Sequence, residues 1–199
     1  MQNISCFFIF HQNASFIHRD QDILSRFLNL NPLQSSRHSR TVTLVKIFIG
    51  VLMNDFSFCW FASGGHAYYT IKFAKMFRKS SIVTLGGFEV AKVPELNYGS
   101  VLDPYRYRQT KYVLENATWI LAVDESLKED AIINYGIEGK NILIVPTGYD
   151  AGYFTPDGEK RNIVMTVAYM NESSIKRKGI ETFIKAAAAF PLTPFIIIG

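Results

Sequence analysis

The sequence predicts an α/β fold built on a doubly wound parallel sheet, and two observations predict it. Short apolar runs rich in β-branched and aromatic residues alternate with segments of helical periodicity. The runs lack a regular polar alternation, which is typical of parallel strands that are covered on both faces. The predicted strands are 56–61, 81–85, 119–123, 141–145, 163–168 and 195–198.

Composition and charge limit the class of protein. The chain has 199 residues, of which 48% are hydrophobic and 19% charged, as in a globular protein. A net charge of +4 and a pI of about 9.0 are compatible with a phosphorylated ligand or an anionic membrane surface. The sequence has no dense run of Lys or Arg, so it does not indicate nucleic acid as a partner. Cys6 and Cys59 lie far apart, so we expect free thiols in a reducing cytoplasm.

The first forty residues carry the weakest pattern. Cys6–Phe10 is an apolar patch without basic residues before it, so it does not indicate a signal peptide. Residues 20–30 have helical spacing with Asp20 as a plausible cap, and residues 31–40 are polar and rich in breakers, as in a loop. Residues 41–52 are mostly apolar and rich in β-branched residues, and they fit either a helix or a strand.

The middle of the chain has clearer element boundaries. A helix over 66–79 follows a Gly-Gly pair, and His66 is expected near its cap. Asp103 and Pro104 have the residue types of a helix cap and a first helical position. A further helix begins at Asp124 or Ser126 and ends at Gly136.

The pattern restarts after a polar, breaker-rich segment. We therefore predict a first domain over 1–154, a linker over 155–161 and the start of a second domain over 162–199. In that second part, residues 171–179 are expected to form a basic loop and residues 180–190 a helix. Two strands and one helix cannot bury both faces of a sheet, so we expect a fragment of a two-domain protein.

A glycine pair marks the first candidate site. Gly86 and Gly87 follow the strand 81–85 directly, and Glu89 comes next. Ligands of open α/β sheets bind at the carboxyl ends of strands, and glycine lets another group approach the backbone closely. A plain Gly-Gly turn with a solvated Glu remains the alternative.

Three cations before a glycine mark the second candidate site. Lys176, Arg177, Lys178 and Gly179 precede a predicted helix, and the N-terminus of a helix favours an anion such as phosphate. A solvated basic loop is the alternative reading. The chain has no dinucleotide fingerprint, phosphate-binding P-loop or histidine spacing for a metal, so we predict no metal and no cofactor.

Four motifs, in this order, resemble the group 1 glycosyltransferases. They are Leu85–Gly99, Ala117–Leu127, Ile144–Asp150 with Phe154 and Pro156, and Lys178-Gly179. The resemblance implies the GT-B architecture, in which two Rossmann-like domains face each other across a cleft, and a retaining sugar transfer. It covers residues 80–199 well and residues 15–80 loosely.

The resemblance also implies roles for matching positions. Gly86, Gly87 and Glu89 would line the acceptor side, although Gly86 stands where many members carry His. A second set, at the end of the first domain, would lie beside the cleft: Thr147, Gly148 and Asp150. The donor's diphosphate would be held by Lys178, with Arg177 and Gly179 beside it. Tyr169 or Met170 stands where members often have Arg, and the Glu-x7-Glu motif of the donor sugar would lie beyond Gly199.

The implied function is transfer of a sugar from a nucleotide-sugar donor to a saccharide or lipid-linked acceptor, by a chain that is inactive as a fragment. A non-catalytic or degenerate module and a sugar-nucleotide epimerase are the alternatives. We expect a cytoplasmic protein. Peripheral contact with the inner face of the membrane, through Arg106, Arg108 and Lys111, is a further hypothesis weighed against a solvated helix face.

Overall fold

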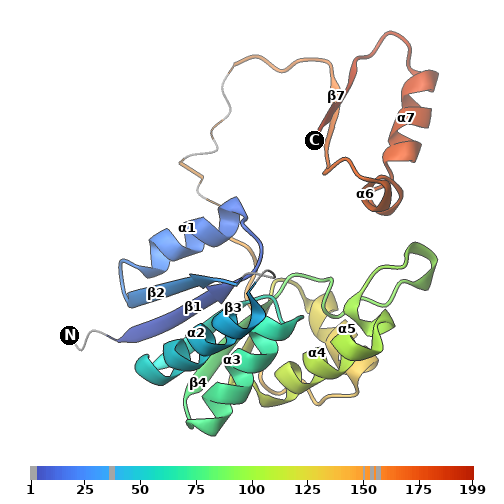
Figure 1. The fold of residues 1–199 in the computed structure, drawn as a ribbon. Coiled ribbons are helices and arrows are strands. Elements are labelled where there is room, and N and C mark those ends of the chain that lie inside the picture. The colour runs from blue at the N-terminus through green and yellow to red at the C-terminus, as the bar shows by residue number, and fades with distance from the viewer. Residues whose placement is uncertain (1–3, 36–38, 150, 153–154, 156–157) are drawn as a thin grey trace. The chain divides into compact units, whose positions relative to one another are not determined.

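Six parallel strands form the centre of the first unit, which runs from Met1 to Thr147 in a computed structural model (Figure 1). The structure describes residues 4–35, 39–149, 151–152, 155 and 158–199. The strand order is β2-β1-β3-β4-β5-β6, and every neighbouring pair is parallel. The strands are β1 (Ser5–Phe10), β2 (Asn29–Gln34), β3 (Phe56–Trp60), β4 (Ser80–Leu85), β5 (Trp119–Ala122) and β6 (Ile142–Ile144). The predicted α/β class with a doubly wound, Rossmann-like parallel sheet is confirmed.

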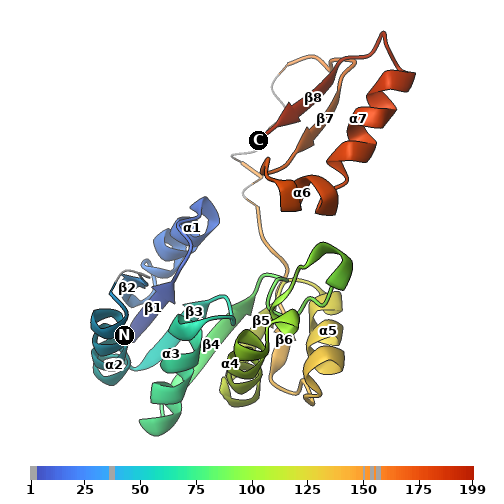
Figure 2. The same ribbon diagram turned by 45° about the vertical axis from the view of Figure 1, so that its right-hand side comes forward.

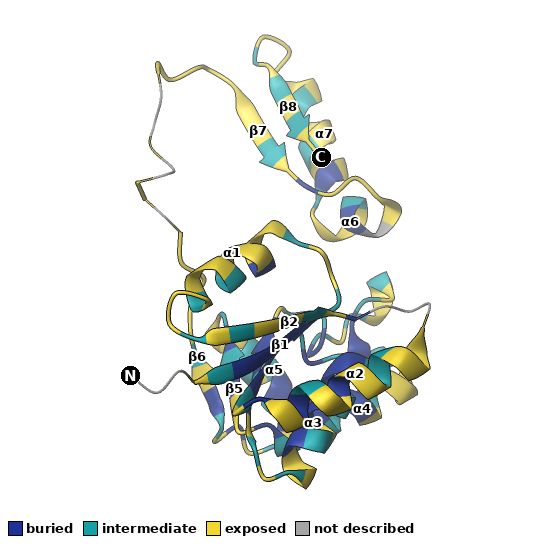
Figure 3. Ribbon diagram, turned by 60° about the vertical axis from the view of Figure 1, so that its left-hand side comes forward, coloured by how far each residue is buried: buried dark blue, intermediate teal, exposed yellow. Residues whose placement is uncertain are grey.

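Helices cover both faces of this sheet (Figure 2). They are α1 (Ser15–Leu24), α2 (Arg40–Met53), α3 (Gly65–Met76), α4 (Pro104–Asn116) and α5 (Glu125–Tyr135), with short 3-10 turns η1 (Pro94–Leu96) and η2 (Ser100–Leu102). The larger core cluster joins α2 to α5 to one face of the strands, through residues such as Ile47, Ile71 and Val113. A smaller cluster on the other face joins α1, through Ile17, to Phe8 and Phe58. Figure 3 shows the central strands as the most buried part of this unit.

The predictions for the first forty residues are largely wrong. Cys6–Phe10 belongs to β1, a central strand whose side chains are almost fully buried. The predicted helix 20–30 is α1, which begins at Ser15, so Asp20 is not its cap. Part of the predicted loop 31–40 is strand β2, because pairing with β1 in register outweighs its breakers. Pro32 is tolerated there because β2 is an edge strand.

The ambiguous segment 41–52 is helix α2, and the later elements follow their predictions closely. The N-terminus of α4 is capped by Asp103, whose Oδ1 accepts the N–H of Tyr105 at 2.9 Å and of Arg106 at 3.1 Å. Asp124, rather than Ser126, caps α5 and accepts the N–H of Ser126 at 2.9 Å. Gly136 ends α5 in the left-handed conformation, with φ of 65°.

The second unit, Gly148–Gly199, contains a two-stranded parallel sheet and two helices. They are β7 (Val164–Val167), α6 (Glu172–Arg177), α7 (Ile180–Ala189) and β8 (Phe195–Ile198). The predicted basic loop over 171–179 is wrong, because α6 occupies most of it. Asn171 caps that helix by accepting the N–H of Ser174 at 2.8 Å, and the basic last turn suits the helix dipole.

The described residues contain neither a membrane-spanning helix nor a metal-binding cluster. No described helix is long and apolar enough to cross a membrane. No group of three or more His, Cys, Asp or Glu side chains among the described residues is placed to hold a metal ion.

Candidate functional site

The order of the strands places a switch point between β1 and β3. The chain leaves β1 toward β2 on one side and leaves β3 toward β4 on the other, so the two loops diverge at the carboxyl edge of the sheet. Ligands of open α/β sheets bind in the crevice that such diverging loops leave. The residues that follow these strands therefore form the candidate site.

Two histidines meet at this switch point. His11 follows β1 and His66 lies in the first turn of α3, and their rings stack with centroids 5.9 Å apart and an interplanar angle of 26°. Nδ1 of His11 lies 3.0 Å from Oγ and 3.2 Å from the carbonyl oxygen of Ser35, the residue after β2. The ends of three strands are thus joined by polar groups.

His66 is held neutral in one tautomer. Its Nε2 lies 3.0 Å from the carbonyl oxygen of Trp60, and a carbonyl only accepts, so Nε2 carries the hydrogen. Burial is the main cause that lowers the pKa of His66 to about 4, with a smaller contribution from His11, and hydrogen bonds to the carbonyls of Trp60 and Phe61 partly oppose it. His66 is 9% exposed, and its Nδ1 is left as a hydrogen-bond acceptor at neutral pH.

The loop after β4 is shaped by its neighbour from β3. A Cβ on Gly86 would lie 2.3 Å from Cε1 of Phe61, so no side chain fits at position 86. Phe61 itself has φ of 71°, and its N–H donates to Oγ1 of Thr84 at 3.3 Å. Gly87 has φ of 110°, which favours glycine. Gly86 is thus required by packing and Gly87 by backbone conformation.

Glu89 lies inside this loop. It is 2% exposed, and its carboxylate accepts the N–H of Gly86 at 3.2 Å. Burial raises the pKa of Glu89 to about 7, opposed by backbone N–H groups that include those of Gly86, Gly87 and Ala62. Oη of Tyr135, from α5, donates to the carbonyl oxygen of Glu89 at 2.6 Å. The carboxyl therefore fixes the Gly86-Gly87 turn from within.

The remaining predicted site residues belong to other parts of the chain. Thr147 and Gly148 are exposed beyond β6, and Asp150 lies outside the described residues. In the second unit, Arg177 is the last residue of α6, Lys178 is its exposed C-cap, and Gly179, with φ of 68°, precedes α7. The structure thus brings Gly86, Gly87 and Glu89 together in one unit and Arg177, Lys178 and Gly179 together in the other.

His11 and Ser35 were missed in the sequence, because the strands before them were not identified. The signal for β1 was present in five consecutive apolar residues, Cys6–Phe10, which is the pattern of a buried parallel strand. A polar residue directly after such a strand is a candidate for the carboxyl edge. The strand β2 gave no comparable signal.

Comparison with known proteins gives a likeness of structure only. No family model matches the chain, and no curated protein matches its sequence. HepE of Anabaena, solved in complex with UDP, matches with a TM-score of 0.60 and 8% identity over 98% of this chain and 70% of its own. Sucrose-phosphate synthase from Thermosynechococcus elongatus matches with a TM-score of 0.67 and 12% identity over 98% of this chain and 62% of its own.

An epimerase shares the same fold. UDP-GlcNAc 2-epimerase from Neisseria meningitidis, bound to UDP-GlcNAc, matches with a TM-score of 0.52 and 12% identity over 98% of this chain and 65% of its own. The chain spans less than two thirds of the length of the synthase and of the epimerase. At such low identities the likeness establishes architecture alone. The chain has a GT-B type fold with Rossmann-like α/β units.

Proposed function

We propose that this chain forms part of a glycosyltransferase that moves a sugar from a nucleotide-sugar donor to a saccharide or lipid-linked acceptor. One observation carries the proposal. The glycine-lined loop and the paired histidines lie at the carboxyl edge of a sheet whose fold is shared with HepE, solved with UDP, and with a sucrose-phosphate synthase. The four motifs that resemble group 1 glycosyltransferases lend support from the sequence.

The acceptor side of the proposal rests on the first unit. Gly86, which is exposed, and Gly87 carry no side chains of their own after β4, so an acceptor can approach their backbone closely. The buried carboxylate of Glu89 fixes this turn by accepting the N–H of Gly86. His11 and His66 supply imidazole nitrogens to hydroxyl groups at the switch point. The resemblance to group 1 glycosyltransferases adds Thr147, Gly148 and Asp150 to the acceptor side as part of this proposal.

The donor side rests on the second unit. When a nucleotide sugar reacts, negative charge develops on the departing diphosphate, and fixed cations stabilise it. Lys178 is exposed where α6 ends, and nothing lies within 4 Å of the position of a Cβ on Gly179, which precedes α7. We assign Lys178, with Arg177 beside it, to the diphosphate. Two buried free thiols, Cys6 and Cys59, support a cytoplasmic location as part of the proposal.

Ligand-dependent stability tests this function directly. The 199-residue chain is melted with UDP, UDP-glucose, UDP-GlcNAc and GDP-mannose, because a ligand that binds only the folded form raises the melting temperature. We expect at least one nucleotide sugar to raise it in a saturable manner. Adenosine and free glucose serve as controls that lack the diphosphate. If no nucleotide sugar raises the melting temperature above these controls, the donor assignment is wrong.

A sugar-nucleotide epimerase is the second candidate. The observation in its favour is that two of the structural matches are named as UDP-GlcNAc 2-epimerases, one of them putative. An epimerase converts its substrate without an acceptor, whereas a transferase needs one. Incubation with UDP-GlcNAc alone, followed by proton NMR, separates the two, since a new sugar epimer in the absence of acceptor supports the epimerase.

A further inference from the structure

The outward face of helix α2 is apolar, which is unusual for a helix at the surface of a sheet. Ile47 and Val51 face the core and are buried. The opposite face exposes between 44% and 72% of each of five side chains: Val42, Val45, Ile49, Leu52 and Met53. A surface helix normally turns charged and polar residues outward, so a helix that is apolar on both sides calls for a covering.

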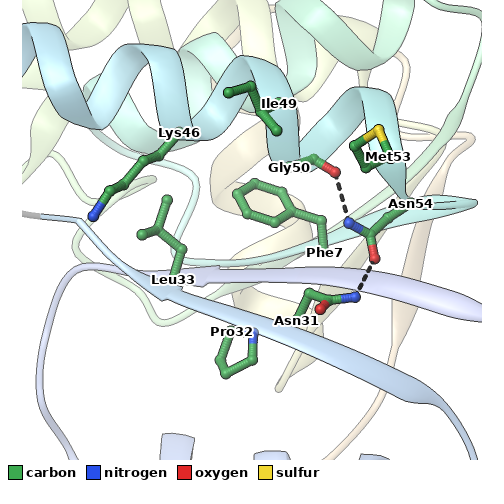
Figure 4. Close-up of a pocket in the computed structure, with 9 residues that line it drawn as sticks. All are labelled: Phe7, Asn31, Pro32, Leu33, Lys46, Ile49, Gly50, Met53 and Asn54. Atoms are coloured by element: carbon green, nitrogen blue, oxygen red, sulfur yellow. Dashed lines mark hydrogen bonds between the residues drawn. The ribbon is translucent and has the colours of Figure 1, made fainter.

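A hollow of about 360 Å³ continues this face toward strand β2 (Figure 4). Ile49 and Met53 line it from the helix, and Phe7, Pro32 and Leu33 line it from the sheet. Its floor is fixed by packing and by two amide hydrogen bonds. The ring of Phe7 fills the place of a side chain at Gly50, and the amide of Asn54 joins Asn31 to the helix. The hollow and the helix face therefore form one apolar surface.

The charged residues of α2 and of its neighbour α3 are all cations. Neither α2 nor α3, which packs beside it, contains Asp or Glu. The exposed charged residues on these helices and directly after α3 are all basic: Arg40, Lys46, Lys72, Lys75 and Arg78. Lys46 lines the hollow itself. The first carboxylate after α2 is Asp55, which accepts hydrogen bonds of 2.7 Å from both N and Oγ of Ser5.

We propose that α2 docks this unit on the surface of an anionic lipid bilayer, with its apolar face in the acyl boundary and the hollow receiving part of a lipid chain. An apolar helix face flanked by cations is the chemistry that binds such a surface. Only fourteen residues long, α2 would lie in the plane of the interface. A second copy of this chain is a poorer occupant, because a symmetric contact would place these cations against each other.

Helix α4, for which the sequence left membrane contact as a hypothesis beside a solvated helix face, suits a bilayer less well. Arg106 pairs with Asp103 at 3.5 Å, and Lys111 pairs with Glu115 at 3.9 Å. Among large apolar side chains, α4 exposes Tyr105 alone within its described residues. The proposal for α2 does not depend on the proposed function, since it can be tested without a sugar or an acceptor.

Vesicle sedimentation tests the proposal with the whole 199-residue chain. We expect the chain to pellet with vesicles of phosphatidylcholine and phosphatidylglycerol, to pellet much less with phosphatidylcholine alone, and to be released by salt. The double variant Val45→Glu/Ile49→Glu should lower the bound fraction at least about tenfold, because it removes apolar contact and adds anionic charge. Both positions are half exposed, so the melting temperature should stay close to that of the wild type.

Matched variants separate this surface from the rest of the molecule. Ile133→Glu, at an exposed apolar position on α5, should leave binding unchanged. Arg40→Gln/Lys46→Gln, at two exposed cations of α2, should weaken binding by roughly fivefold for each residue, whereas Arg108→Gln/Lys111→Gln on α4 should not. Wild-type binding by Val45→Glu/Ile49→Glu, or equal binding to both lipid mixtures, overturns the proposal. If light scattering shows a dimer that Ile49→Glu dissociates, the face binds a second copy of the chain. That result also overturns the lipid proposal.

Discussion

The ring of Phe61 occupies the space that a side chain at Gly86 would need, with only 2.3 Å from its Cε1 to the position of a Cβ. Many group 1 glycosyltransferases, which this sequence resembles, carry His at the position of Gly86. The contact gives a physical reason for the glycine, because the loop after β3 fills the place where that side chain would begin. Gly86, directly after β4, and Phe61, directly after β3, therefore have to be considered as a pair.

Gly86→Ala should destabilise the chain by about 1–3 kcal/mol, since the added methyl overpacks a site closed by an aromatic ring. Urea unfolding followed by circular dichroism measures the loss. Gly148→Ala is the matched control, because nothing lies within 4 Å of a Cβ there. When Phe61 is already replaced by alanine, adding Gly86→Ala should lower the free energy of unfolding clearly less than it does in the wild type. A full penalty in that background would show that the ring is not the cause.

Glu89→Gln should change how stability depends on pH. The folded chain raises the pKa of Glu89 from 4.5 to about 7, so it binds this proton more tightly than the unfolded chain does. Binding of this proton adds up to about 3 kcal/mol to the free energy of unfolding. The contribution is fully present below pH 4.5 and is lost as the pH rises through 7. Glutamine stays neutral and should remove this loss.

Unfolding in urea at several pH values between 4.5 and 8 tests the role of Glu89. The expected result is a wild type that weakens relative to Glu89→Gln as the pH rises. The exposed Glu129→Gln is the control and should follow the wild type. Parallel curves for Glu89→Gln and the wild type would refute the assignment.

His66 should behave in the opposite sense. Its pKa in the folded chain is about 4, below the usual 6.5, so its contribution to stability is present above pH 6.5 and lost as the pH falls through 4. Nitrogen-detected NMR of the imidazole rings should show a neutral ring with hydrogen on Nε2 from pH 8 to about 5. A hydrogen on Nδ1, or a titration midpoint near 6.5, would contradict the buried hydrogen bond to Trp60.

Lys178→Ala should weaken binding of a nucleotide sugar at least about tenfold, the scale of losing one charge-assisted contact. Isothermal titration with the nucleotide sugar that most raises the melting temperature measures the dissociation constant. Lys185→Ala, on the exposed surface of α7, is the control with the same change of charge. Equal dissociation constants for the two variants would remove Lys178 from the proposed donor site.

The parts of the fold that were predictable are those with local signals. Asp103 and Pro104 mark the start of α4 by cap chemistry, and Gly136 marks the end of α5 by its left-handed backbone. Strand β2 has no such signal. Its residues become a strand only because β1 provides a partner in register, and that contact is not visible in a window of sequence.

The same distinction holds for the candidate site. Gly86, Gly87 and Glu89 lie within four consecutive residues, and the sequence located them as a group. It could not show that the carboxyl of Glu89 turns inward, because that depends on the N–H of Gly86, nor that Tyr135 from α5 holds the backbone carbonyl of Glu89. The meeting of His11 with His66 was hidden as well, because it follows from the strand order.

Proline in β2 has a consequence for how this sheet meets other polypeptides. The outermost strands of an open sheet carry unpaired backbone groups that can recruit a further strand from another molecule. Pro32 has no N–H to offer, and β6, at the opposite border, is only three residues long. Both edge strands are therefore poor templates for edge-to-edge pairing, which protects the unit from self-assembly into extended β aggregates.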